Sequence, residues 1–228
     1  MTMIDMTDRI SIQVGLSGYS FKLQADGQVQ SSGWMSPDRI FSTPELQKRY
    51  SEVEVSVFTP KFALVPSQFH QPENSRQMLS DVVSLADDDN VEYVSVPDHA
   101  AVMLYSNTVV GSISRVVAET VLRVDGTKAR PLPESYYMLK HLSDIPEYNK
   151  ILASYKDENL YLVIAQGKSL LFCNTFKAPD FTTAQYFIFL AMKKLQLNPE
   201  VSSIYFRTPL EADQEMSLYR YFRNVEQM

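Results

Sequence analysis

The sequence predicts a mixed α/β (α+β) protein in two parts, each led by a β-hairpin. The clearest evidence lies in Asn159 to Thr208, where two apolar runs rich in β-branched and aromatic residues flank the turn Gln166-Gly167-Lys168. A helix from about Phe181 to Leu197 follows, with Asp180 as its predicted N-cap. The middle of this helix is apolar almost all round, which predicts that it lies inside the protein. Strand Val201–Phe206 completes the unit.

A second hairpin opens the chain. Ile10–Val14 and Tyr19–Leu23 alternate apolar and polar residues on either side of a turn at Gly15–Gly18. The two hairpins share the pattern Gly-x-Ser, at Gly18–Ser20 and at Gly167–Ser169. Such a short match gains meaning from the strands and helices that follow both copies, because a repeated hairpin-plus-helix unit indicates a duplicated topology.

The duplication predicts two lobes, residues 1–156 with connecting helices and the shorter 157–228. Further strands are expected at Gln28–Trp34, Val53–Phe58, Phe62–Val65, Val91–Val96 and Ala101–Tyr105. Further helices are expected at Thr43–Tyr50, 73–86, Glu134–Leu142, Glu147–Tyr155 and Glu211–Asn224, while Ser112–Leu122 fits either a helix or a strand. Val53–Phe58 alternates most regularly and is expected to bury one face. The acidic run Asp87–Asn90 is expected to be a solvated loop, because a calcium loop needs spaced ligands and a glycine turn.

Composition excludes several classes of function. The 228 residues are 45% hydrophobic and 21% charged, as in an ordinary globular protein. A net charge of −6 argues against a nucleic-acid-binding surface, and no apolar run is long enough to predict a membrane span. Cys173 is the only cysteine, so no disulfide can form within the chain. Met1–Ile12 lacks the apolar run of a signal peptide, and a cytoplasmic location is expected.

The sequence resembles an uncharacterised family of Bacteroidetes proteins assigned an actin-like ATPase fold. The residues that carry the resemblance are Ser11–Phe21, Val57–Pro66 with Phe69, Leu170–Phe176, and Asp180-Phe181. The likeness covers nearly the whole chain. It implies a duplicated, two-lobed fold of the ribonuclease H-like type seen in actin, sugar kinases and chaperone ATPases, and it implies no activity.

The resemblance also raises the question of whether the chemistry of that fold is kept. Actin-like ATPases bind nucleotide phosphates and a metal between two hairpins, typically with Asp-x-Gly at the first. Here the first hairpin reads Gln13-Val14-Gly15, and the second reads Ala165-Gln166-Gly167. A neutral amide is a poor ligand for a hard cation. The nucleotide site is therefore expected to be degenerate, with no cofactor and no metal. Only if the cleft binds an anion or nucleotide would Gly15, Gly18, Gly167 and Lys168 take part.

No other catalytic constellation is evident. His70, His99 and His141 lack metal-ligand spacing, and Cys173 lies in an apolar strand without a neighbour that would lower its pKa. Tyrosines on the less apolar helices suggest protein contacts instead; they are Tyr136, Tyr137, Tyr148, Tyr155, Tyr219 and Tyr221.

The first hypothesis is therefore a non-catalytic actin-like protein acting through protein–protein contacts, as an adaptor or scaffold with a protein partner or as a homodimer. A divergent nucleotide or small-molecule binder is the alternative, and an enzyme of unrecognised type is the third hypothesis. Side chains such as Tyr19 or Lys168 filling the cleft would favour the first, and an open polar cleft would favour the second.

Overall fold

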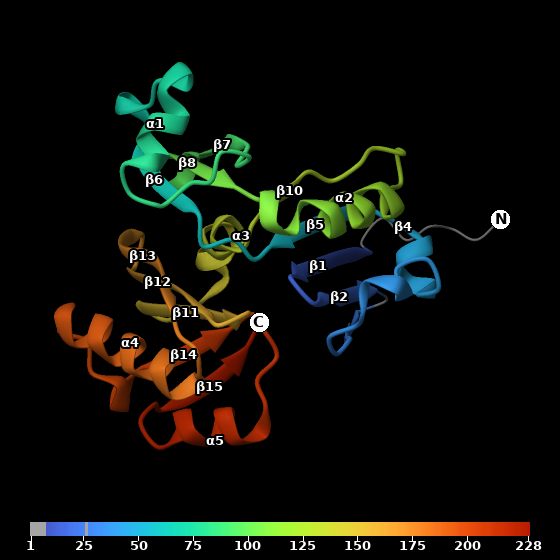
Figure 1. Ribbon diagram of the computed structural model, residues 1–228. Coiled ribbons are helices and arrows are strands. Elements are labelled where there is room, and N and C mark those ends of the chain that lie inside the picture. The colour runs from blue at the N-terminus through green and yellow to red at the C-terminus, as the bar shows by residue number, and fades with distance from the viewer. Residues whose placement is uncertain (1–7, 26) are drawn as a thin grey trace. The chain divides into compact units, whose positions relative to one another are not determined.

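A computed structural model describes residues 8–25 and 27–228 of the chain. The chain folds into two compact units (Figure 1). The first comprises residues 1–63, 71–93 and 104–133, and the second comprises residues 64–70, 94–103 and 134–228. The predicted lobe boundary between residues 156 and 157 stays a prediction. Residues 1–7 and Asp26 lie outside the described residues, and with them most of Met1–Ile12 and the first residue of a turn that the sequence predicts at Asp26-Gly27.

The first unit is built on a five-stranded sheet with the order β10-β5-β1-β2-β3. Its strands are β1 (Arg9–Gly15), β2 (Gly18–Ala25), β3 (Gln28–Ser31), β5 (Glu52–Val57) and β10 (Pro131–Pro133). Strands β1, β2 and β3 are antiparallel neighbours, whereas β1–β5 and β5–β10 are parallel. The predicted opening hairpin is confirmed, with Gly15 paired to Gly18.

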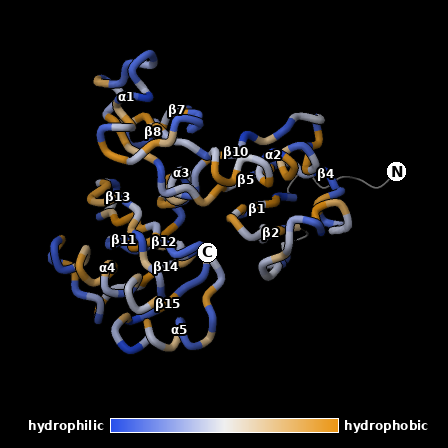
Figure 2. The backbone as a smooth tube through the Cα atoms, viewed as in Figure 1, coloured by the Kyte–Doolittle hydropathy of each residue, from blue (hydrophilic) through white to orange (hydrophobic). Residues whose placement is uncertain are grey.

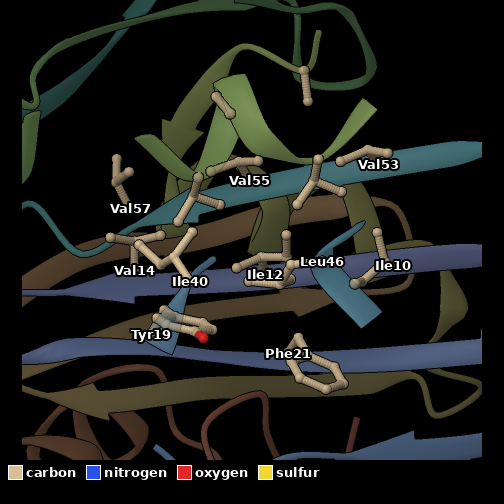
Figure 3. Close-up of a cluster of buried hydrophobic side chains, with 14 of the residues drawn as sticks. Ile10, Ile12, Val14, Tyr19, Phe21, Ile40, Leu46, Val53, Val55 and Val57 are labelled. Carbon is tan, nitrogen blue, oxygen red and sulfur yellow. The ribbon is translucent and has the colours of Figure 1, made fainter. Parts of the chain in front are cut away.

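One face of this sheet carries the core of the first unit. Ile10, Ile12 and Val14 alternate along β1 and are at most 1% exposed. They pack with side chains from β2 and β5, and with Ile40 and Leu46 from two 3₁₀ turns (Figure 3). Helix α2 (Gly111–Thr120) adds Val117 to the same cluster. In Figure 2 hydrophobic stretches occur in both units, near β1 and β5 in the first and near β13 and α4 in the second.

The second unit repeats this plan. Its sheet has the order β13-β12-β11-β14-β15, the same arrangement read from the opposite edge. The strands are β11 (Asn149–Lys156), β12 (Asn159–Gln166), β13 (Ser169–Lys177), β14 (Ser203–Phe206) and β15 (Asn224–Gln227). Strands β11, β12 and β13 are antiparallel neighbours, and β11–β14 and β14–β15 are parallel. Each pairing in the first sheet thus has a counterpart in the second.

Helices cover the second sheet. Helix α4 (Phe181–Lys194) and helix α5 (Ala212–Tyr219) pack on one face, with Ile188 and Leu218 fully buried against Ile151 and Ile204 (Figure 1). Helix α3 (Glu134–Lys140) contacts β11 and β12. The Asp180 carboxylate accepts a hydrogen bond from the N–H of Thr183 at 2.7 Å, which confirms the predicted N-cap of α4.

Shorter elements complete the chain. Strands β6 (Phe62–Pro66), β8 (Ala101–Ser106) and β7 (Val91–Val96) form a three-stranded sheet, and β4 (Arg49–Tyr50) pairs with β9 (Leu122–Arg123). Helix α1 spans Ser75–Ser80.

Several predicted elements are wrong or shorter than expected. The expected helix Glu147–Tyr155 is strand β11, and the end of the predicted helix Glu211–Asn224 begins strand β15. The expected helix 73–86 is limited to α1 after a 3₁₀ turn, and the predicted helix at Thr43–Tyr50 is a 3₁₀ turn at Pro44–Gln47. The ambiguous segment Ser112–Leu122 is largely helix α2.

Two predictions about burial are also wrong. Strand β5 is buried on both faces, since Glu54 and Ser56 are 7% and 0% exposed and the strand lies between β1 and β10. Helix α4 is not enclosed by protein, because Tyr186 is 59% exposed on the side away from the sheet. Phe187 of α4 stacks on Phe176 of β13, and Tyr186 packs edge-on against Phe187, so aromatic residues also lie on the outer part of this helix.

The acidic run Asp87–Asn90 is only partly solvated. Asp87 and Asp88 are exposed, but Asp89 is 4% exposed. Its carboxylate is paired with Lys61 and accepts hydrogen bonds from Ser106 Oγ and the N–H of Ala86, both at 2.7 Å. Burial alone would raise the pKa of Asp89, but these bonds lower it to about 2. The carboxylate therefore joins the loop after α1 to β6 and β8.

We expect Asp89→Ala to lower the free energy of unfolding by about 2–3 kcal/mol, because Lys61 and Ser106 would lose their shared acceptor. Since the folded pKa lies below the ordinary value, the contribution of Asp89 should be full above pH ~4 and lost as pH falls toward ~2. Urea unfolding at several pH values measures both effects. Asp88→Ala is the matched control, and equal destabilisation by the two variants would contradict the assignment.

Candidate functional site

Each unit has a candidate site at its leading hairpin, because the two hairpins occupy equivalent positions in their own sheets. Strand β1 is central in its sheet, with β2 antiparallel on one side and β5 parallel on the other. Strand β11 has the same place, between β12 and β14. Ligands in α/β proteins commonly bind beyond the carboxyl ends of such parallel strands. The chemistry of the turns that follow β1 and β11 therefore decides what each unit can bind.

This equivalence corrects the repeat derived from the sequence. Gly167-Lys168 does form a predicted hairpin turn, but it joins β12 to β13 and therefore corresponds to the β2–β3 turn of the first unit. The counterpart of Gly15–Gly18 is the turn Asp157-Glu158 between β11 and β12. The match of Gly18–Ser20 with Gly167–Ser169 was therefore out of register. It arose because β11, the first strand of the true hairpin, was predicted to be a helix.

In the first hairpin, Gly18 has a structural reason to be glycine. Its φ is +153°, and a Cβ atom placed there would lie 2.0 Å from the carbonyl oxygen of Met35. The backbone of the adjacent Tyr19 exchanges two hydrogen bonds with Met35, at 3.0 and 2.8 Å. The segment containing Met35 thus lies directly against the hairpin, and Gly18 is required for this close approach whether or not a ligand binds.

The position expected to carry a carboxylate is occupied by a buried amide. Gln13 is 7% exposed and is paired with Ser20 on β2 and Ser56 on β5, both of which are also buried. These three side chains form a polar row across the sheet, on the face opposite Ile12 and Val14. Tyr19, whose presence in a cleft would have favoured the first hypothesis, is fully buried, and its hydroxyl lies 2.8 Å from Thr43 Oγ1 inside the first unit.

The second hairpin does carry acidic residues, which the sequence analysis missed. Asp157 and Glu158 have φ values of +51° and +58°, the left-handed conformation that a two-residue turn of this type requires. Asparagine and glycine are the usual residues there, and Glu is an unfavourable one. The signal was present in the sequence as four polar residues, Lys156 to Asn159, between two apolar runs.

Both carboxylates have a lysine neighbour. Lys156 Nζ lies 3.9 Å from Asp157 Oδ1, with the two side chains 17% and 13% exposed. Burial lowers the pKa of Lys156 below its ordinary value, and the charge of Asp157 opposes this shift. Glu158 is more exposed and lies 3.7 Å from Lys177. The turn thus combines carboxylates and an amine, an arrangement that could bind a polar ligand or stabilise the hairpin alone.

A buried charged cluster lies at the carboxyl ends of β11 and β14. Glu134 is fully buried and accepts a hydrogen bond from Ser154 Oγ at 2.7 Å. Arg207 Nε lies 3.8 Å from Glu134 Oε1, and the guanidinium group lies over the ring of Tyr137. The cluster connects α3, β11 and the segment after β14 next to the second hairpin. Among the described residues, no group of three or more His, Cys, Asp or Glu side chains could hold a metal ion.

The remaining predicted site residues, Gly167 and Lys168, lie in the β12–β13 turn, at the opposite end of β12 from Asp157 and Glu158. Gly167 donates its N–H to the carbonyl of Tyr148 at 2.8 Å, so this backbone donor already has a partner in the protein. A Cβ atom at Gly167 would lie 3.2 Å from the ring of Tyr148. Lys168 is exposed in the same turn. Burial raises the pKa of Cys173 to about 12, which disfavours the reactive thiolate.

We expect Gly18→Ala to lower the free energy of unfolding by about 2 kcal/mol or more, because the new methyl group would overlap the Met35 carbonyl. Thermal unfolding of the purified variant measures the loss. Gly33→Ala is the control, since a Cβ atom there meets nothing within 4 Å. A Gly18→Ala protein as stable as the wild type would show that the hairpin and the Met35 segment can separate freely.

Glu158→Gly should have the opposite effect and raise the free energy of unfolding by about 1 kcal/mol, because glycine adopts a left-handed conformation without strain. The exposed ion pair with Lys177 that it removes contributes little. Glu200→Gly, at an exposed position without positive φ, should be destabilising and serves as the control in the same chemical denaturation series. Destabilisation by Glu158→Gly would mean that its side chain stabilises the turn by more than the strain costs.

Comparison with known proteins connects this architecture to a family. Residues 12–225 match the profile of a family described as "Protein of unknown function (DUF3822)". No curated protein matches the chain significantly.

Among solved structures, a Bacteroides thetaiotaomicron protein described as having an actin-like ATPase fold and unknown function aligns with a TM-score of 0.68. Its identity to this chain is 16%, over 100% of this chain and 94% of that one. The cytoplasmic domain of EpsL, an inner membrane component of the type II secretion system of Vibrio cholerae, aligns at 0.49 and 14% identity, over 90% and 84% of the two chains. A chain of a PilM–PilN type IV pilus biogenesis complex aligns at 0.49 and 12% identity, over 98% and 89%.

The family match extends over most of the chain, and the duplicated sheets agree with the fold of the Bacteroides thetaiotaomicron protein. The chain therefore belongs to the DUF3822 family of proteins of unknown function and has an actin-like ATPase fold.

Proposed function

We propose that this protein is a non-catalytic actin-like protein that acts through protein–protein contacts, as an adaptor or scaffold. The first hairpin carries this proposal, because its expected metal-binding position holds the buried amide of Gln13. A charged carboxylate is a stronger ligand for a hard cation, and a neutral amide within a packed polar row is a poor substitute for it. Gly15 and Gly18 then remain as parts of a tight hairpin, with Gly18 fixed against Met35.

The surface of the protein offers side chains suited to protein contacts. Of the tyrosines identified from sequence, Tyr148, Tyr219 and Tyr221 are 70%, 50% and 52% exposed, whereas Tyr137 is buried. Exposed tyrosine rings are favourable at protein interfaces, since they bury a large apolar area while the hydroxyl group keeps its hydrogen bonds. The proposal includes a cytoplasmic location, because the chain has a single cysteine and cannot form an internal disulfide. No helix in the described part of the chain has the length and apolar character needed to cross a membrane.

Thermal unfolding with millimolar Mg²⁺-ATP, ADP or GTP tests the proposal, and we expect no shift in the unfolding midpoint. A nucleotide present at about 100 times its dissociation constant would stabilise the fold by about 2.7 kcal/mol, or roughly 5–10 °C for a chain of this size. A shift of that size would overturn the degenerate-site proposal.

One observation favours a second candidate, a divergent binder of nucleotides or small molecules. Asp157 lies in the turn equivalent to the first hairpin, is mostly buried, and has Lys156 beside it. If a nucleotide does shift the midpoint, Asp157→Asn should remove the shift while Asp87→Asn, an exposed change distant in sequence, should keep it. A shift unaffected by Asp157→Asn would place the ligand elsewhere.

A further inference from the structure

Strand β13 is the outer strand of the second sheet and pairs, among the described strands, with β12 alone. It is nine residues long, and Ser169 to Phe176 contains no charged residue and no proline. An outer strand has a row of backbone N–H and C=O groups that face away from its neighbour. A long, uncharged outer strand is therefore a template for pairing with another strand.

The other outer strands of the two five-stranded sheets differ from β13. Strand β10 has prolines at Pro131 and Pro133, which cannot donate a backbone hydrogen bond. Strand β15 has four residues and carries Glu226, and β3 has four exposed residues and is mostly polar. Short length, charge and proline are the usual features that prevent edge-to-edge pairing. Strand β13 has none of them before Lys177.

One hydrogen bond shows which groups on β13 face outward. The N–H of Thr175 donates to the side-chain oxygen of its neighbour Asn174 at 2.9 Å, so this N–H is directed away from β12. Because outward groups alternate along an antiparallel strand, the backbone groups of Cys173 and Lys177 have the same direction. The exposed side chain of Asn174 thus occupies a position that the carbonyl of a pairing strand would take.

Aromatic rings line the face of the sheet beside this edge. The rings of Phe172 and Phe176 are stacked with centroids 5.9 Å apart, and Phe176 stacks on Phe187 of α4 at 4.5 Å. Tyr186 packs edge-on against Phe187 and is 59% exposed. Both β13 phenylalanines are only half-buried. A strand added to the edge would therefore find an apolar surface for its side chains on this face.

We propose that β13 pairs antiparallel with β13 of a second copy of this chain, in a register centred on Asn174. This inference rests on the proposed function and names one partner for it. In that register Phe172 lies opposite Phe176 of the second copy, and each Asn174 lies opposite the other. Cys173 lies opposite Thr175 of the second copy, and these are the residues whose backbone groups face outward, so their hydrogen bonds can form.

The chemistry of the strand favours a second copy over an unrelated strand. Residues 169–176 carry no charge, so the strand meets itself without repulsion between like charges. The twofold axis places two Phe172–Phe176 pairs on the aromatic face, and cross-strand aromatic pairs stabilise antiparallel sheets. The β12–β13 pairing is irregular at Leu171, where the alternation of the strand changes. The residues paired in the proposed register, 172–176, all follow this irregularity. Facing asparagine amides can hydrogen-bond to each other across the axis.

Analytical ultracentrifugation of the full chain over a range of concentrations tests the proposal. The wild type should form a dimer, and Asn174→Lys should weaken it about a hundredfold or more, because two lysines would face each other across the axis. Asn174→Asp should do the same. An equimolar mixture of these two variants should restore the dimer, since the opposite charges then meet. Met216→Lys, on an exposed residue of α5, is the matched control and should remain dimeric.

Hydrogen exchange of the wild type gives a readout that needs no variant. The amides of Cys173 and Thr175 should exchange more slowly at high than at low protein concentration. A monomer at all concentrations, or a dimer that Asn174→Lys leaves intact, would overturn the proposed pairing. Mixed variants that stay monomeric would overturn its register. None of these results changes the nucleotide experiment, so the pairing and the degenerate site fail or stand separately.

Discussion

The structure depends on how the first strand of each sheet is paired. Strands β1 and β11 each have an antiparallel hairpin partner on one side and a parallel neighbour on the other. With both edges occupied, a one-residue slip would move every side chain of the strand to the opposite face. For β1 that slip would exchange Ile12 and Val14 with Gln13. The register therefore fixes both the apolar core and the polar row, and with them the turn that follows the strand.

The two hairpins share this topology but differ in chemistry. The turn after β1 is held close to Met35 through Gly18, and its neighbouring polar position is an amide. The turn after β11 contains Asp157 and Glu158 in left-handed conformations next to lysines. The two units thus share one backbone topology, but the acidic turn residues lie in the second hairpin and the first has an amide at its neighbouring polar position.

Sequence patterns were sufficient for the opening hairpin, the β12–β13 hairpin, the cap of α4 and the family. They failed at β11 because Asn149-Lys-Ile-Leu-Ala-Ser-Tyr-Lys156 follows Pro146 and has apolar residues at spacings that a short helix also allows. Pairing with β12 and β14 decides for the strand, and that is a contact between distant parts of the sequence. The burial of Asp89 could not be predicted from the sequence either, because its partners Lys61 and Ser106 are far from it along the chain. A local acidic run carries no sign of such partners.

The burial of the Cys173 thiol has a practical consequence for anyone who studies this protein. Burial raises the pKa of this thiol to about 12, so the reactive thiolate is disfavoured and we expect slower reaction with maleimides or iodoacetamide than for an exposed cysteine. It is also the only thiol in the chain. A cysteine introduced at an exposed position such as Tyr148 or Met216 would therefore accept a fluorophore or spin label selectively, without first removing the native residue.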